Sequence, residues 1–240
     1  MNRSLKDRVA IVVGSSSGMG KATALAFAGA GAKVVLAARR AEQLHALAAE
    51  IGENARPCPT DVQDATAVEQ LINTTLDGFG RIDILVYVTG TNIPERSLDV
   101  ISNETWDMMI RTNLTGAFYC TKAVLPTMRR QKDGLIIYVS SAAVQLPDTS
   151  GVSYQATKHG MVGLAYGTRK EEKDNGIRTS VIFPGLTDTP LVLKRPVPTP
   201  PEVVAKALQP QDVADACLFV ASLPARAYVP ELVLLPAGLA

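Results

Sequence analysis

The chain has 240 residues, of which 47% are hydrophobic and 20% are charged, a balance typical of a soluble globular protein. Its net charge of +1 gives no basic field for nucleic acid or for an anionic membrane, so we expect neither partner. The apolar run at residues 9–13 is too short for a signal peptide, and no stretch approaches the roughly 18 apolar residues of a membrane span. We therefore expect a cytoplasmic protein.

Strand-like and helix-like segments alternate along the chain. Apolar runs predict strands at 9–13, 33–38, 55–59, 82–88, 135–139, 179–183 and 231–235. Helical patterns lie between them at 18–30, 41–51, 65–77, 105–130 and 153–174. This alternation predicts an α/β fold with a doubly wound, mostly parallel sheet of about seven strands, helices on both faces and right-handed crossovers. We treat residues 1–240 as one domain.

The cysteines fit a reduced protein. Cys58, Cys120 and Cys217 lie far apart, form no CxxC pair and are odd in number. Ordinary packing in the interior is the simple interpretation of each thiol. We predict no metal site.

The first predicted strand runs into Gly14-Ser15-Ser16-Ser17-Gly18-Met19-Gly20. Glycines permit a tight turn and a close approach of a ligand to the backbone. The N-terminus of the following helix offers unpaired N–H groups to a phosphate, and the serines add hydroxyl donors. Between the first strand and the first helix of an alternating domain, this turn indicates a dinucleotide site, although a tight turn without a ligand has the same composition.

The end of the second strand indicates which dinucleotide binds. An acidic residue there suits a ribose 2′-hydroxyl, whereas arginine suits a 2′-phosphate. The chain has Ala38-Arg39-Arg40 and no acid before Glu42. NADP(H) is therefore favoured over NAD(H), unless both arginines are merely solvated at the helix start.

Tyr154 and Lys158 lie four residues apart in a helical stretch and so share one face. A nearby ammonium favours the phenolate and is expected to lower the tyrosine pKa, which would allow proton exchange with an alcohol or carbonyl. Ser141, at the end of a strand, could hydrogen-bond the same oxygen. Spacing alone is weak, because most such pairs are an amphipathic side chain beside a solvated cation. His159 is adjacent to Lys158 but should point about 100° away from it.

Taken together, these motifs resemble the short-chain dehydrogenase/reductase family over nearly the whole chain, with its Rossmann-like fold. The resemblance implies catalytic roles for Asn113, Ser141, Tyr154 and Lys158. It implies a cofactor site made of Gly14, Ser15, Ser17, Gly18, Met19, Gly20, Arg39, Arg40, Asp61, Val62, Gly90, Tyr154, Lys158, Pro184, Gly185, Thr187 and Thr189. In the implied mechanism Tyr154 gives a proton to a carbonyl oxygen, Ser141 orients that oxygen, Lys158 binds ribose hydroxyls and Asn113 positions a water.

The predicted substrate region follows strands five and six. Ligands of open α/β sheets bind beyond the carboxyl ends of strands, so a substrate loop is expected around 186–205. Its proline-rich part, 190–201, could also be a plain surface connection. Candidate pocket residues are Ala143, Gln145, Leu146, Leu186, Leu191 and Val192. They are mostly apolar, as small-molecule pockets usually are, and an apolar ketone or 3-oxoacyl thioester would suit them.

Two segments depart from the family pattern. Tyr87-Val88-Thr89-Gly90 replaces its Asn-Asn-Ala-Gly after the fourth strand, so the ring at position 87 must pack differently. The C-terminal segment, which the family often uses in tetramer contacts, contains Pro230, which cannot donate to a sheet ladder. A homo-oligomer, dimer or tetramer, is expected.

The leading functional hypothesis is a carbonyl reductase or alcohol dehydrogenase using NADP(H). One alternative is a non-catalytic NADP(H)-binding regulator on the same fold, which the altered strand-four segment favours and the matched catalytic positions disfavour. A sugar-nucleotide epimerase of the extended branch of the superfamily is a weaker alternative, because the chain is short for an added substrate domain.

Overall fold

The computed structural model describes residues 4–146 and 148–239, and its centre is a seven-stranded parallel sheet. The strand order is β3-β2-β1-β4-β5-β6-β7, and every neighbouring pair is parallel. The strands are β1 (Val9–Val13), β2 (Lys33–Ala38), β3 (Ala55–Pro59), β4 (Ile84–Tyr87), β5 (Gly134–Val139), β6 (Ile177–Pro184) and β7 (Glu231–Leu234). The predicted Rossmann-like α/β fold is confirmed.

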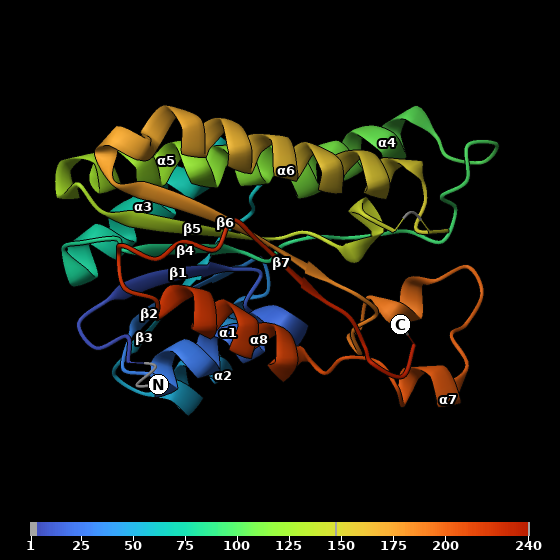
Figure 1. Cartoon of the computed structure of the whole chain (residues 1–240), viewed down its shortest axis with the longest axis horizontal. Helices are drawn as coiled ribbons and strands as arrows, with labels where there is room; N and C mark the ends of the chain where they lie inside the picture. Colours follow the sequence, from blue (N-terminus) through green and yellow to red (C-terminus); the bar gives the residue numbers. More distant parts are fainter. Residues whose placement is uncertain (1–3, 147, 240) are drawn as a thin grey trace.

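Helices cover both faces of this sheet (Figure 1). One layer holds α1 (Gly18–Gly29), α2 (Ala41–Ile51) and α8 (Pro210–Ala221). The other holds α3 (Ala65–Phe79), α4 (Asn103–Ile110), α5 (Gly116–Gln131) and α6 (Val152–Glu172). A short helix, α7 (Pro201–Val204), lies in the predicted substrate loop, away from both layers.

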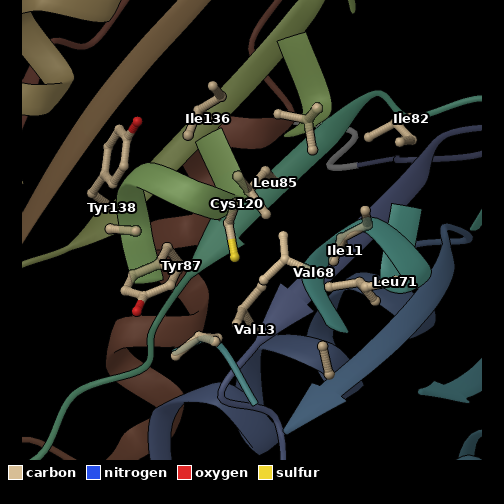
Figure 2. Packing of buried hydrophobic residues seen from close by; sticks show 14 of the residues in the cluster. Ile11, Val13, Val68, Leu71, Ile82, Leu85, Tyr87, Cys120, Ile136 and Tyr138 are labelled. Carbon is tan, nitrogen blue, oxygen red and sulfur yellow. The ribbon is translucent and has the colours of Figure 1, made fainter. Parts of the chain in front are cut away.

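The core follows from the alternation of side chains along buried strands. Ile11 and Val13 of β1 belong to the cluster under α3, α5 and α6, whereas Ala10 and Val12 belong to the cluster under α1, α2 and α8. Figure 2 shows the first cluster, in which Cys120 points toward strand and helix side chains. Burial on both faces explains why the strands appear in the sequence as continuous apolar runs.

Helix α8 is absent from the elements expected from sequence. It begins with a capping box, in which Asp212 accepts from the Gln209 N–H at 2.7 Å, and Pro210 occupies the first turn. Gln-Pro-x-Asp is a helix-start signal that could have revealed it. α8 packs along α1 and buries Val213, Cys217 and Val220.

The expected long helix at 105–130 is present but interrupted. Between α4 and α5, η1 (Arg111–Thr115) forms a π-helical segment that contains Asn113. A π segment inserts an extra residue into the helix and often occurs at functional sites.

The strand order reverses beside β1, because β2 and β3 lie on one side of it and β4 begins the other. At such a switch point the loops after the two central strands diverge and leave a crevice. Gly14 directly follows β1, and Gly90 lies in the segment after β4. Both therefore lie at the predicted ligand-binding edge.

Candidate active site

The turn after β1 is built for close backbone contact. A side chain at Gly14 would come within 2.9 Å of the Thr89 nitrogen, and its φ of +98° also favours glycine. A Cβ at Gly20 would overlap the Gly14 carbonyl. The glycines thus let α1 start directly against the strand end. Ser17 is the N-cap of α1, yet its side chain caps no N–H group there.

A groove of about 420 Å³ opens over this turn. Its lining includes Gly14, Ser16, Ser17, Gly18, Met19, Gly20, Arg39, Arg40, Asp61, Val62, Gly90, Thr189, Pro190, Leu191 and Lys194. The Arg40 guanidinium donates to the hydroxyls of Ser16 and Ser17, at 2.8 and 2.7 Å. This ties the end of β2 to the glycine turn and places cations beside unpaired N–H groups, as a phosphate would require.

Two details of the groove differ from the sequence prediction. Ser15 is buried and donates to the Ala37 carbonyl at 3.4 Å, so it faces the sheet, and the groove is lined by Ser16 in its place. Lys194 reaches the groove from the loop after β6 and donates to the Thr91 hydroxyl at 3.1 Å. No local motif pointed to Lys194, because its approach depends on a loop distant in sequence.

A second cavity, of about 350 Å³, lies beside the groove and shares Met19, Thr189 and Leu191 with it. Of the residues predicted for the site, its lining contains Ser141, Ala143, Leu146, Tyr154, Pro184, Gly185, Leu186, Thr187, Leu191 and Val192. Gln145 is not part of that lining; it follows the turn η2 (Ala142–Val144) and is exposed. The cavity also contains Asn92, Arg96 and Arg195, which sequence reasoning missed.

Tyr154 is half-buried and reaches the second cavity from the first turn of α6. Burial raises its pKa, and the nearby Ser141 hydroxyl offsets only part of that rise. The expected net lowering by Lys158 is therefore wrong for this structure, because desolvation of the phenol dominates. Ser141 accepts from the Ala143 N–H at 3.2 Å, which leaves its own hydroxyl hydrogen available to a ligand oxygen or to Tyr154.

Lys158 is buried at 3% exposure, one turn further along α6. Its Nζ lies 5.7 Å from the centre of the Tyr154 ring and donates to the Val139 carbonyl at 2.9 Å. Desolvation lowers its pKa to about 8, so the ammonium form still dominates at neutral pH. A Cβ at Gly90 would lie 3.2 Å from Nζ, so the glycine leaves room for the amine.

Asn113 links the π segment to the loop after β4. Its Oδ1 accepts from the Thr91 N–H at 2.8 Å, while Nδ2 donates to the Thr91 carbonyl at 3.0 Å and to Thr157 at 3.2 Å. The side chain is fully buried. Asn113 therefore fixes the loop beside Gly90.

The altered strand-four segment has its own packing solution. Tyr87 is fully buried and donates to the Thr112 carbonyl at 2.7 Å, within the π segment. A Cβ at Gly116 would come within 2.6 Å of the Tyr87 hydroxyl, so glycine makes space for the ring. Tyr87 thus braces the helix segment that carries Asn113. Figure 2 shows its ring among the labelled side chains of the core.

His159, which is adjacent to Lys158 in the sequence, lies outside the site, as its helical position predicts. His159 is exposed and its Nδ1 bonds the Gln155 carbonyl at 2.8 Å, one turn back on α6.

Across the part of the chain described, no helix is long and apolar enough to cross a bilayer.

Comparison with known proteins identifies the family. The model of the short chain dehydrogenase family matches residues 8–196. The chain belongs to this family. Its members include a 3-oxoacyl-[acyl-carrier-protein] reductase of a Synechocystis strain that is 38% identical over 231 residues, which cover 94% of this chain and 93% of the relative.

Solved structures of short-chain dehydrogenases share the whole fold. A 3-ketoacyl-(acyl-carrier-protein) reductase from Brucella melitensis, complexed with NADH, superposes with a TM-score of 0.91 at 26% identity and covers 98% of this chain and 99% of its own. A metagenomic short-chain oxidoreductase in complex with NADP gives a TM-score of 0.84 at 30% identity, with coverage of 97% and 98%. These structures show that the fold accommodates a nicotinamide dinucleotide.

Proposed function

We propose that this short-chain dehydrogenase is an NADP(H)-dependent oxidoreductase that interconverts a carbonyl and an alcohol, with Tyr154 as proton donor and acceptor. The observation that carries the proposal is the placement of Tyr154. It lines, together with Ser141, a cavity that joins the glycine-turn groove, and the Lys158 Nζ lies 5.7 Å from the centre of its ring.

The groove fits a dinucleotide by its own chemistry. Glycine backbone, unpaired helix N–H groups and a guanidinium already oriented by two serines match a phosphate-rich ligand. Arg39, Arg40 and Lys194 favour the additional 2′-phosphate of NADP(H). Both NADH and NADP occur in the structures that resemble this chain, so the preference rests on these cations.

When bound, the nicotinamide would supply or accept the hydride. The raised pKa of Tyr154 keeps the phenol protonated at neutral pH, so it can donate to a carbonyl oxygen during reduction. The Ser141 hydroxyl orients that oxygen. The Lys158 ammonium stabilises the phenolate that forms, and its hydrogen bond to the Val139 carbonyl holds it in place.

The test uses NADPH with a panel of ketones, 3-oxoacyl thioesters, quinones and imines, and compares the wild type with Tyr154→Phe. We expect the variant to bind NADPH normally and to lose roughly 10²–10⁴-fold in turnover. Tyr166→Phe is the matched control, because Tyr166 is a 39%-exposed tyrosine of the same helix. Retained turnover in Tyr154→Phe would overturn the proposal.

The same panel tests the alternative role. A protein that binds NADPH but turns over nothing in the panel would support the non-catalytic regulator. The cytoplasmic location and the homo-oligomer stay predictions from the sequence.

A further inference from the structure

The second cavity contains two arginines that the proposed proton transfer does not use. Arg96 comes from the segment after β4, and Arg195 from the loop after η4 (Val192–Lys194). Both line the same space as Tyr154 and Ser141. The remaining charged residue in the lining is Asp148, so these side chains together carry a net charge of +1.

Arg96 is held in place by its surroundings. Gly151, with φ +91°, has its backbone against the arginine, and a Cβ there would lie 2.7 Å from the Arg96 Cβ. Asn92 donates to the Ser150 carbonyl at 2.8 Å and fastens the same loop four residues before Tyr154. The Arg96 Nε is buried and has no hydrogen-bond partner among the residues that the structure describes. A buried donor without a partner is costly, so a ligand that draws the Arg96 guanidinium into hydrogen bonds would relieve a cost present in the free protein.

The two guanidiniums are not neutralised by carboxylates. Across residues 4–146 and 148–239, neither forms an ion pair within 4.0 Å, and Arg195 donates to the Thr199 hydroxyl at 3.3 Å. Asp148 is exposed, and its Oδ1 accepts from the Ser150 N–H at 2.9 Å.

The charges act on one another and on the tyrosine. Desolvation lowers the pKa of Arg96, and the Arg195 charge lowers it further, whereas Asp148 raises it. Arg195 and Arg96 also lower the pKa of Tyr154 through space, against the larger effect of burial. Two cations that repel in a partly desolvated cavity are stabilised when an anion enters between them.

We propose that the substrate is a short oxo acid or the corresponding hydroxy acid, whose carboxylate binds Arg96 and Arg195 while its carbonyl oxygen meets Tyr154 and Ser141. The net charge of +1 in the lining matches a monoanion better than a dianionic phosphate. A cavity of about 350 Å³ is near the lower end for small-molecule sites and suits a short substrate. This inference rests on the proposed oxidoreductase function, and the carboxylate is unchanged by the reaction.

The activity test pairs 2-oxo, 3-oxo and 4-oxo acids with their methyl esters, and adds dihydroxyacetone phosphate. We expect kcat/KM for the best acid to exceed that for its ester by at least about tenfold. Arg96→Gln and Arg195→Gln should each raise KM for the acid by about tenfold and raise KM for the ester by a much smaller factor. Arg226→Gln is the matched control, since Arg226 is exposed and lies in the segment before β7. That segment is at the amino ends of the parallel strands, whereas the cavity is at their carboxyl ends.

A binding test separates this inference from the proposed function. Butanoate, which has no carbonyl to reduce, should raise the Tm of the wild type relative to equal sodium chloride, and should not do so in the Arg96→Gln, Arg195→Gln double variant. Equal activity on acid and ester, or equal loss of both in the variants, would overturn the oxo-acid assignment while oxidoreductase activity stands. Preference for the phosphate would also overturn it. If no carbonyl is turned over, the proposed function fails, and a Tm response lost in the double variant would show that the anion site exists.

Discussion

The groove and the second cavity meet at one edge of the sheet, but they are built in different ways. The groove is lined mainly by segments that directly follow β1, β2, β3 and β4, with a further part from the loop after β6. The cavity takes its charged residues from loops far apart in the chain, around Arg96, Asp148 and Arg195. The order of strands and turns therefore positions the groove, whereas the charge of the cavity depends on loop residues that distant parts of the chain supply.

The largest expected effect tests whether the groove is a backbone structure. Gly20→Ala places a methyl group into the Gly14 carbonyl, which no rotamer change can relieve. We expect it to abolish NADPH binding and to lower the free energy of unfolding by at least about 3 kcal/mol. Denaturant titration and NADPH fluorescence titration measure both. Gly29→Ala is the control: a Cβ there would meet nothing within 4 Å, so the variant should be neutral or slightly stabilising.

Arg40 tests the contribution of side chains to the groove. Arg40→Gln removes the guanidinium that contacts Ser16 and Ser17. A charge-assisted hydrogen bond is worth about 1.5–3 kcal/mol, so NADPH affinity should fall roughly tenfold to a hundredfold while NADH affinity changes little. Titration with NADPH and with NADH measures the two affinities. An equal loss of affinity for both cofactors would show that Arg40 shapes the turn and does not bind the 2′-phosphate.

The pH dependence of reductive kcat/KM tests the role of the Lys158 ammonium. The pKa of Lys158 is lowered to about 8, so its charge is present below that pH and is lost above it. Reductive kcat/KM should therefore fall as pH rises through about 8, by roughly tenfold at pH 9, because the forming phenolate loses its cation. The unfolded lysine keeps its proton to a higher pH, so this group adds folding stability as pH rises over the same window. Circular dichroism at each pH checks that the fold persists; a flat profile to about pH 9.5 would contradict the assigned role.

The smallest effect concerns the altered strand-four segment. Tyr87→Phe removes the hydrogen bond to the Thr112 carbonyl and should cost about 1 kcal/mol in the free energy of unfolding. If Tyr87 braces the π segment, the variant should also weaken turnover through Asn113 with little change in NADPH affinity. Urea unfolding and steady-state kinetics measure the two effects. Tyr119→Phe, a half-buried ring on α5, is the control.

Several features of this short-chain dehydrogenase are determined by local sequence. Continuous apolar runs such as Val9–Val13 specify strands buried on both faces, and their alternation with helices specifies the doubly wound sheet. The glycine turn and Ala38-Arg39-Arg40 follow strand ends directly, so their position at the sheet edge follows from strand geometry. Tyr154 and Lys158 share a helix face because they are four residues apart.

Other features depend on how distant segments pack. Ser15 faces the sheet rather than the groove because of the direction of the backbone at the end of β1. The pKa of Tyr154 rises because desolvation, which no motif encodes, outweighs the neighbouring charges. The partnership of Arg96 and Arg195 bridges 99 positions of sequence and depends on loops that only the folded sheet brings to one cavity. Local sequence therefore determines the glycine turn and the arginines of the nucleotide groove, whereas the tertiary structure adds Lys194 to that groove and decides the charge that a substrate meets.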